Sequence, residues 1–162
     1  MIRVQSGPFD PADEMTRFTA GAPQAGAVAS FVGLVRAEGD RVARLSLDHY
    51  PGFTEREMAR IEAAARSRFG VDDTLVIHRY GEMAPGEAIV LVAAAAAHRQ
   101  PALEAVSFLM DWLKTDAPFW KREDGPAGAR WIEPRAEDRA ARAGWSEANT
   151  DAHAASSQTE TP

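Results

Sequence analysis

The chain has 162 residues, a formal net charge of −6 and no cysteine. A chain of this length buries about 70% of the surface that it exposes when unfolded, so one core can hold it without disulfides or a structural metal. The missing cysteines exclude a thiolate nucleophile, a protein-bound persulfide and an iron–sulfur cluster. The acidic balance argues against nucleic-acid binding through a basic surface.

Location follows from the same simple features. The start of the chain lacks the apolar core of a signal peptide. The longest apolar run, residues 88–97, is too short to cross a bilayer. We therefore expect a cytoplasmic protein with no membrane contact, and the absence of cysteine fits that reducing compartment.

The first elements are two strands with a helix between them. Alternating residues 2–6 predict a short strand. Asp10, followed by proline, predicts the N-cap and first position of a helix over residues 11–20. The apolar, β-branched residues 26–36 predict a buried strand that is interrupted at Gly33.

The middle of the chain predicts a strand, a helix and another strand. The alternation in residues 42–50 indicates a half-buried strand, paired in hairpin fashion with the strand before it. Thr54, with Glu57 as its capping-box partner, predicts the start of a helix that ends at Gly70. Its apolar stripe consists of Met58, Ile61, Ala65 and Phe69. Residues 74–80 predict the next strand.

The rest of the chain predicts one more buried strand, a long helix and two short strands. The strand covers residues 88–97, although its alanines have high helical propensity. The helix begins at Gln100-Pro101 and ends before Pro118. Its apolar face consists of Leu103, Val106, Met110 and Leu113, broadened by Phe108, Leu109 and Trp112. The short strands, residues 119–123 and 129–133, flank a turn-rich loop.

This order of elements favours an α+β domain with a mainly antiparallel sheet and two long helices. We assign residues 1–135 to that domain. Residues 136–162 form a polar C-terminal extension, for which we expect a helix to about Trp145 followed by a disordered tail. No glycine-rich nucleotide-binding loop follows any predicted strand.

Lysine usage is the first chemical signal. Of the 18 basic residues only two are lysines, Lys114 and Lys121, seven positions apart. In a chain that otherwise uses arginine, these positions can require an amine that titrates. A reversal at Pro118 could bring the two together, where neighbouring ammonium groups disfavour each other's charge and leave one amine as a base or nucleophile. The alternative is chance clustering of two surface lysines.

Other cationic residues stand at the ends of predicted elements, where a rigid scaffold presents functional groups. Arg36 follows a strand, and His98-Arg99 precede the long helix. If these ends converge with the lysines, they form a pocket for a phosphate or carboxylate. The alternatives are solvated or ion-paired arginines and a hydrogen-bonded structural histidine. No histidine pair has metal-ligand spacing on one helix, so we expect no metal site.

Eight short motifs, in order, resemble the large, catalytic subunit of molybdopterin synthase, the MoaE family. They are Phe31-Val-Gly-Leu-Val-Arg36, Leu47-Asp-His-Tyr50, His78-Arg-Tyr-Gly81, Gly86-Glu-Ala-Ile-Val90, His98-Arg99, Met110-Asp-Trp-Leu-Lys-Thr115, Ala117-Pro-Phe-Trp-Lys-Arg-Glu123 and Arg130-Trp-Ile-Glu133. The pattern Lys-Thr-x-Ala-Pro-x-Trp-Lys-x-Glu, which begins at Lys114, is the most specific. Asp48 stands where the family usually has Glu, and the tail beyond Arg142 is unlike the family core.

The resemblance implies an α/β hammerhead-type fold and a homodimer within a heterotetramer with two copies of a small ubiquitin-like sulfur carrier. The implied reaction moves sulfur from the thiocarboxylate of the carrier's C-terminal Gly-Gly onto cyclic pyranopterin monophosphate to form the dithiolene of molybdopterin. No cofactor is implied. The missing cysteines agree with this, because the carrier holds the sulfur.

The resemblance also implies roles for individual residues. Lys114 and Lys121 would be the catalytic lysines, with Lys121 next to the carrier tail. The substrate-binding residues, drawn from one or two subunits, would be Arg36, His98, Arg99, Phe31, Met110, Glu123 and Arg135.

Two readings from other classes stay open. One is a non-catalytic module that captures the C-terminal tail of a ubiquitin-like protein with its cations. The other is a small sensor of a phosphate ligand.

Overall fold

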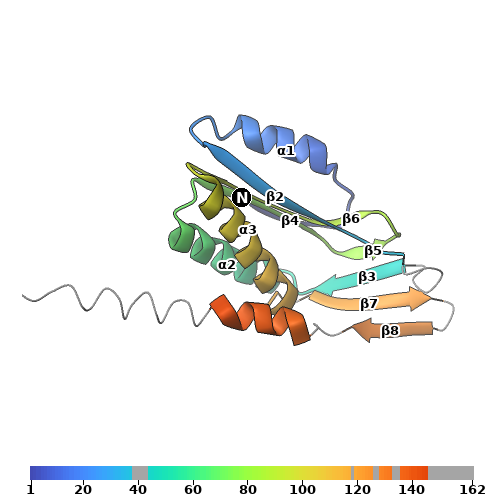
Figure 1. The fold of residues 1–162 in the computed structure, drawn as a ribbon. Helices are drawn as coiled ribbons and strands as arrows, with labels where there is room; N and C mark the ends of the chain where they lie inside the picture. Colours follow the sequence, from blue (N-terminus) through green and yellow to red (C-terminus); the bar gives the residue numbers. More distant parts are fainter. Residues whose placement is uncertain (38–43, 118, 126–127, 133–135, 146–162) are drawn as a thin grey trace, which may run out of the picture.

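The computed structural model describes residues 1–37, 44–117, 119–125, 128–132 and 136–145, and the account below concerns these (Figure 1). In chain order the elements are β1 (Ile2–Gln5), α1 (Pro11–Ala20), β2 (Ala27–Leu34), β3 (Arg44–His49), α2 (Phe53–Phe69), β4 (Asp73–Arg79), β5 (Gly81–Met83), β6 (Ala88–Ala96), α3 (Arg99–Thr115), β7 (Phe119–Gly125) and β8 (Gly128–Ile132). Residues 136–145 form a further helix. The predicted α+β class with two long helices is confirmed.

The first sheet has strand order β1-β4-β6-β2 and is antiparallel except for the β1–β4 pair. Helices α2 and α3 cover one of its faces and α1 covers the other (Figure 1). Beneath α1, the side chains of Leu75, Ile77 and Leu91 pack with those of Phe9 and Phe18. The central strands β4 and β6 are therefore covered on both faces, which explains their continuous apolar sequence.

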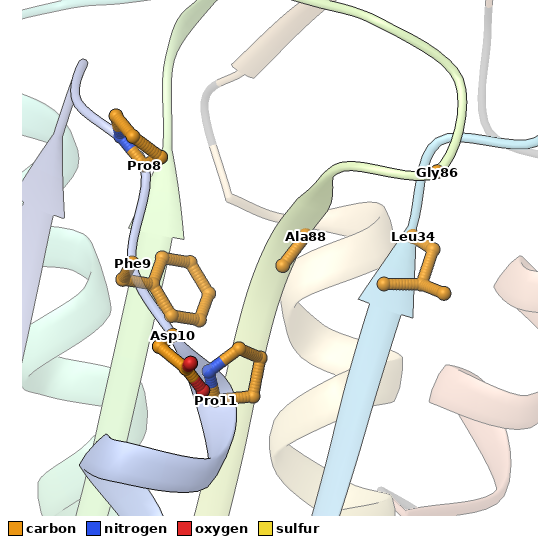
Figure 2. A pocket seen from close by; sticks show the side chains of 7 residues that line it. All are labelled: Pro8, Phe9, Asp10, Pro11, Leu34, Gly86 and Ala88. Atoms are coloured by element: carbon orange, nitrogen blue, oxygen red, sulfur yellow. The ribbon is translucent and has the colours of Figure 1, made fainter.

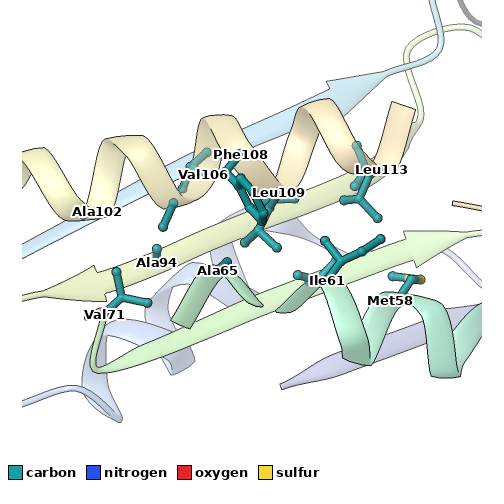
Figure 3. Packing of buried hydrophobic residues seen from close by; sticks show 14 of the residues in the cluster. Met58, Ile61, Ala65, Val71, Ala94, Ala102, Val106, Phe108, Leu109 and Leu113 are labelled. Atoms are coloured by element: carbon teal, nitrogen blue, oxygen red, sulfur yellow. The ribbon is translucent and has the colours of Figure 1, made fainter. Parts of the chain in front are cut away.

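The main core lies between this sheet and the two long helices (Figure 3). Helix α2 contributes Met58, Ile61 and Ala65, as its predicted stripe requires, with Phe69 partly buried. Helix α3 contributes the buried residues Ala102, Ala105, Val106, Phe108, Leu109 and Leu113. Leu103 was expected on this face, but it is 58% exposed, so that part of the prediction is wrong. The alanines of β6 let α3 approach the sheet closely.

The second sheet has strand order β5-β3-β7-β8 and lies beyond one end of the first (Figure 1). Strand β3 pairs antiparallel with both β5 and β7. The expected hairpin between the strand of residues 42–50 and the preceding strand is therefore wrong. The two short C-terminal strands are confirmed as β7 and β8, which pair antiparallel.

Strand β2 corrects another expectation. It forms the outer edge of the first sheet instead of a buried strand. Four of its large apolar side chains are exposed: Val28, Phe31, Val32 and Leu34. The predicted interruption is present, because the pairing register with β6 shifts between Gly33 and Leu34. An edge strand with apolar side chains in solvent is a candidate for further strand pairing.

The N-terminus of α1 is capped by the predicted residue, whereas that of α2 is not. Asp10 caps α1 as predicted, and its carboxylate accepts a hydrogen bond from the backbone N–H of Ala12 at 2.8 Å. Helix α2 begins two residues earlier than expected, after Gly52, whose N–H donates to Glu55 at 2.6 Å. The predicted Thr54–Glu57 capping box is therefore wrong, and the Thr54 hydroxyl instead accepts from the backbone N–H of Tyr50. In the described ranges no helix combines the length and apolar character that crossing a membrane requires.

Candidate functional site

Both lysines stand close to the connection between α3 and β7. Lys114 is in the last turn of α3, and Lys121 is the third residue of β7. Helix α3 ends with a backbone hydrogen bond from the N–H of Asp116 to the carbonyl of Trp112 at 2.8 Å. The structure therefore places the two lysines on adjoining elements, and the approach of one amine to the other stays a prediction.

Each amine has a carboxylate neighbour. The Nζ atom of Lys114 lies 3.3 Å from Oδ1 of Asp138, in the helix of residues 136–145. The Nζ atom of Lys121 lies 3.3 Å from Oε1 of Glu123. Lys121 and Glu123 are two residues apart on one strand, so they share a face of the second sheet. The pairs keep both lysines partly ordered and leave both partly exposed to an incoming group.

Arg36 stands at the same end of the first sheet as the connection between α3 and β7. It follows β2, whose end pairs with the start of β6 through Leu34 and Ala88. The N–H of Val35 donates to the carbonyl of Glu87 at 2.9 Å, which fixes the backbone beside Arg36. Helix α3 starts after β6 and runs back across β6 and β2, so its last turn returns toward the start of β6 (Figure 1).

His98 and Arg99 stand at the opposite end of that sheet. They lie between the end of β6 and the start of α3, and both are exposed. Lys114 is fifteen residues further along the helix, which corresponds to roughly 22 Å at 1.5 Å per residue. The nine residues of β6 separate its two ends by roughly 27 Å. A single chain therefore does not bring His98 and Arg99 to Arg36 and the lysines.

The remaining predicted residues do not lie together. Phe31 is 41% exposed on the edge strand β2, opposite Val92 of β6. Met110 is partly buried in the middle of α3, where it packs against the main core. Glu123 lies beside Lys121, as stated. Arg135 lies outside the described residues.

One hollow lies beside the lysine strand, and a second lies apart from the predicted site residues. The first, of about 280 Å³, is lined by Asp48, His49, Tyr50 and Trp120. Trp120 directly precedes Lys121 and is 56% exposed, so an aromatic wall stands next to the lysine strand. The sequence pointed to no pocket at this place, because the motif around Asp48 carried no assigned role.

The second hollow is separate from the cations. It has a volume of about 530 Å³ and lies between the loop before α1 and the end of β2 (Figure 2). Its lining is Pro8, Phe9, Asp10, Pro11, Leu34, Gly86 and Ala88. The carboxylate of Asp10 is already used to cap α1. This hollow therefore contains none of the predicted site residues.

His78 supports the strand that carries Lys121. It is buried in β4, and its ring stacks on that of Phe119, the first residue of β7, with centroids 3.9 Å apart and planes at 15°. Its Nδ1–H donates to the carbonyl of Arg79 at 2.9 Å. Burial lowers the pKa of His78 to about 4, although the hydrogen bond to Arg79 acts in the opposite direction. The ring is therefore neutral at pH 7, and its role is structural.

The described part of the chain has no group of three or more histidine, aspartate or glutamate residues that could hold a metal ion. The side chains beside the connection between α3 and β7 include amines and carboxylates. Such a set can bind an anion and move protons.

Comparison with known proteins gives the family. Residues 4–116 match the model of the MoaE protein family. The chain belongs to the MoaE family. It is 50% identical to the molybdopterin synthase catalytic subunit of Caulobacter vibrioides, over 86% of this chain and 93% of that protein.

Solved structures agree with this membership. The molybdopterin biosynthesis MoaE protein of Burkholderia ambifaria superposes with a TM-score of 0.78 at 44% identity, covering 90% of this chain and 97% of that one. A complex of subunits 1 and 2 of the Helicobacter pylori molybdopterin-converting factor contains a chain with the same fold, with a TM-score of 0.72, 24% identity and coverage of 83% and 91%. The MoaE-type fold of this chain is thus established independently of its motifs.

Proposed function

We propose that this MoaE-family chain is the catalytic subunit of a molybdopterin synthase. It moves sulfur from the C-terminal thiocarboxylate of a small ubiquitin-like carrier onto cyclic pyranopterin monophosphate. The observation that carries this proposal is the placement of the chain's two lysines on adjoining elements, α3 and β7, in a member of a family whose relatives are named for this synthase. The absence of cysteine supports an external sulfur donor. We expect the reaction to take place in the cytoplasm.

The proposed chemistry uses the amines and the guanidinium in different ways. Arg36 binds the substrate phosphate, since a guanidinium forms paired, charge-assisted hydrogen bonds with phosphate oxygens. Lys121 meets the carrier tail, and its amine stabilises the charge that develops as the thiocarboxylate sulfur attacks the pterin. In each of the two sulfur transfers a carbon–sulfur bond forms on the pterin as a carbon–oxygen bond at the same carbon breaks, and the departing oxygen takes up a proton from a lysine ammonium group. The acyl carbon–sulfur bond of the carrier then breaks by attack of water, which leaves a carrier carboxylate, and the lysines assist the proton transfers.

The substrate site needs a second copy of the chain if His98 and Arg99 take part. Strand β2 has a free edge and exposed apolar side chains. Antiparallel pairing of β2 with its copy creates a two-fold dimer and sets the Ala27 end of one strand beside the Leu34 end of the other. Because Ala27 pairs with Ala96, this arrangement carries His98 of the partner subunit toward Arg36. We therefore propose a homodimer with two composite sites, each served by one carrier.

Reconstitution tests the function directly. Purified protein is mixed with thiocarboxylated carrier and cyclic pyranopterin monophosphate, and molybdopterin is quantified by chromatography. We expect product from the wild type and a loss of at least about a hundredfold in Lys121→Arg, which keeps the charge but not the compact amine. Arg56→Lys, an exposed change on α2, is the matched control and should retain activity.

Other outcomes would replace the proposal. Complex formation with the carrier without loss of its sulfur would indicate a non-catalytic module for a ubiquitin-like tail. Binding of the pterin with no response to the carrier would indicate a ligand sensor. Near-normal turnover of Lys121→Arg would reject the role of the amine.

A further inference from the structure

The helix of residues 136–145 packs beside the end of α3 through one face. Asp138, Arg142 and Trp145 are spaced i, i+4 and i+7, so they project from the same side of this helix. All three contact residues of α3. The helix therefore has a defined place next to Lys114, although its sequence is rich in alanine and charge, as a solvated helix would be.

Trp145 anchors the far end of this helix. Its indole Nε1–H donates to Oδ2 of Asp111 at 2.7 Å. Its ring meets those of Phe69 and Phe108 edge to face, with centroids 5.7 and 5.5 Å away. The guanidinium of Arg68 donates to the carbonyl of Trp145 at 2.7 Å. These contacts join the helix to both α2 and α3.

Arg142 adds a second attachment, one turn closer to Lys114. Its Nε donates to Oδ2 of Asp116 at 3.0 Å. Its guanidinium carbon lies 3.3 Å from the centre of the Trp112 ring, a close cation–π contact. Arg142 thus fixes the helix at the last turn of α3, where Lys114 is located.

The third contact on this face reaches the lysine itself. Asp138 lies one further turn along the helix, and its Oδ1 is 3.3 Å from Nζ of Lys114. The lysine side chain is 53% exposed and the aspartate 22% exposed. A lone surface pair restrains a lysine weakly, because two flexible side chains must be ordered together. Here Trp145 and Arg142 hold the helix that carries Asp138, so the backbone beneath the carboxylate is already fixed.

We propose that Asp138 is a positioning residue that holds the Lys114 amine beside the end of α3. The inference rests on the proposed function for its catalytic meaning. Lys114 carries four rotatable side-chain bonds, and its orientation decides how often the amine meets a reacting group. The carboxylate of Asp138 limits the orientations of the Lys114 side chain without contacting substrate. The C-terminal helix is in this way part of the support of the site.

The composition of the chain allows a direct test of the orientation. With only two lysines, selective ¹³C labelling of lysine gives two Cε resonances, whose relaxation reports the mobility of each side chain. We expect Asp138→Asn to increase the mobility of Lys114 and leave Lys121 unchanged. Glu137→Gln removes an exposed carboxylate from the adjacent position of the same helix and should change neither. Unchanged mobility of Lys114 in Asp138→Asn would overturn the proposal.

Kinetics test the consequence for the reaction. Asp138→Asn should lower kcat about fivefold, the upper range for loss of an exposed ion pair, with the KM values for carrier and pterin unchanged. Asp138→Glu retains the carboxylate and should recover most of kcat. The indole N–H resonance of Trp145 verifies that the helix stays docked in each variant. A kcat equal to that of wild type in Asp138→Asn, or no recovery in a docked Asp138→Glu, would also overturn the proposal.

The experiments distinguish failure of the proposed function from failure of the role proposed for Asp138. If the wild-type protein makes no molybdopterin, the proposed function is wrong, whereas the lysine relaxation still decides whether Asp138 orients Lys114. If the wild type is active and the relaxation of Lys114 does not respond to Asp138, the inference is wrong and the function stands.

Discussion

Protonation of His78 should destabilise the fold at mildly acidic pH. The ring is buried, and its pKa is lowered to about 4 from an ordinary value of 6.5. The unfolded chain therefore binds a proton more readily than the folded one between these two values. The contribution of neutral His78 to stability is fully present above about pH 6.5 and is lost as the pH falls toward 4.

The size of the effect follows from the two pKa values. At pH 5 the unfolded state is mostly protonated at this residue and the folded state mostly is not. Linkage then gives a loss of about 2 kcal/mol in the free energy of unfolding relative to pH 7.5. Protonation should also destabilise the strand that carries Lys121, because His78 stacks on Phe119 at the start of that strand.

Urea unfolding at pH 7.5 and pH 5.0 measures this change. In His78→Phe, which keeps an aromatic ring against Phe119, the free energy of unfolding should fall by about 2 kcal/mol less than in the wild type over the same interval. The comparison cancels the contributions of other titrating groups. The Cε1–H resonance of His78 should stay constant from pH 8 to pH 5.5. A midpoint near 6.5, or equal pH dependence in both proteins, would refute the reasoning.

Three more predictions concern the core, the sheet edge and the phosphate site. Leu109→Ala removes a side chain that is 1% exposed and should lower the free energy of unfolding by about 3 kcal/mol, as measured by urea denaturation; a loss below about 1 kcal/mol would contradict the packing. Val32→Asp places a charge on the free edge of β2 and should weaken self-association at least about tenfold in sedimentation experiments, whereas Ala63→Asp on exposed α2 should not. Arg36→Ala should raise the KM for the pterin about tenfold, and unchanged affinity would remove Arg36 from the phosphate site.

Periodicity alone was sufficient for the long elements. The stripe of Met58, Ile61 and Ala65 defined the buried face of α2, and the apolar run from Ala88 defined β6 despite its helix-favouring alanines. These elements are covered by their own chain, so the spacing of their apolar residues predicts which of their faces are buried. Leu103 shows the limit of this reasoning, because one apolar residue beside a correct stripe can still be exposed.

Strand β2 shows why pattern does not determine position in a sheet. Its apolar residues are typical of a buried strand, yet Val28, Val32 and Leu34 are exposed at an edge. A strand that is buried by its own chain and one that a second chain covers have the same local sequence. The pairing of β3 was missed for a related reason, since the order of strands depends on contacts that are far apart in the chain.

The neighbourhood of the two lysines was predictable, because both lie in one short segment of the sequence. The structure places Lys114 in the last turn of α3 and Lys121 in β7, and their catalytic role stays a prediction. The separation of His98 and Arg99 from Arg36 was not predictable from spacing, because it depends on the antiparallel pairing of β2 with β6. Asp138 gave no signal, because an aspartate in a polar helix is ordinarily solvated.

The most direct test of the account mixes two inactive variants. Arg99→Ala and Lys121→Ala are unfolded together, refolded as an equimolar mixture and assayed for molybdopterin with thiocarboxylated carrier. If each site combines Lys121 of one chain with Arg99 of the partner subunit, half of the dimers are mixed and each contains one intact site. Molybdopterin formation by the mixture should then recover to roughly a quarter of wild-type activity, as random pairing of two-fold dimers requires. Activity no higher than that of the separate variants would contradict a composite site.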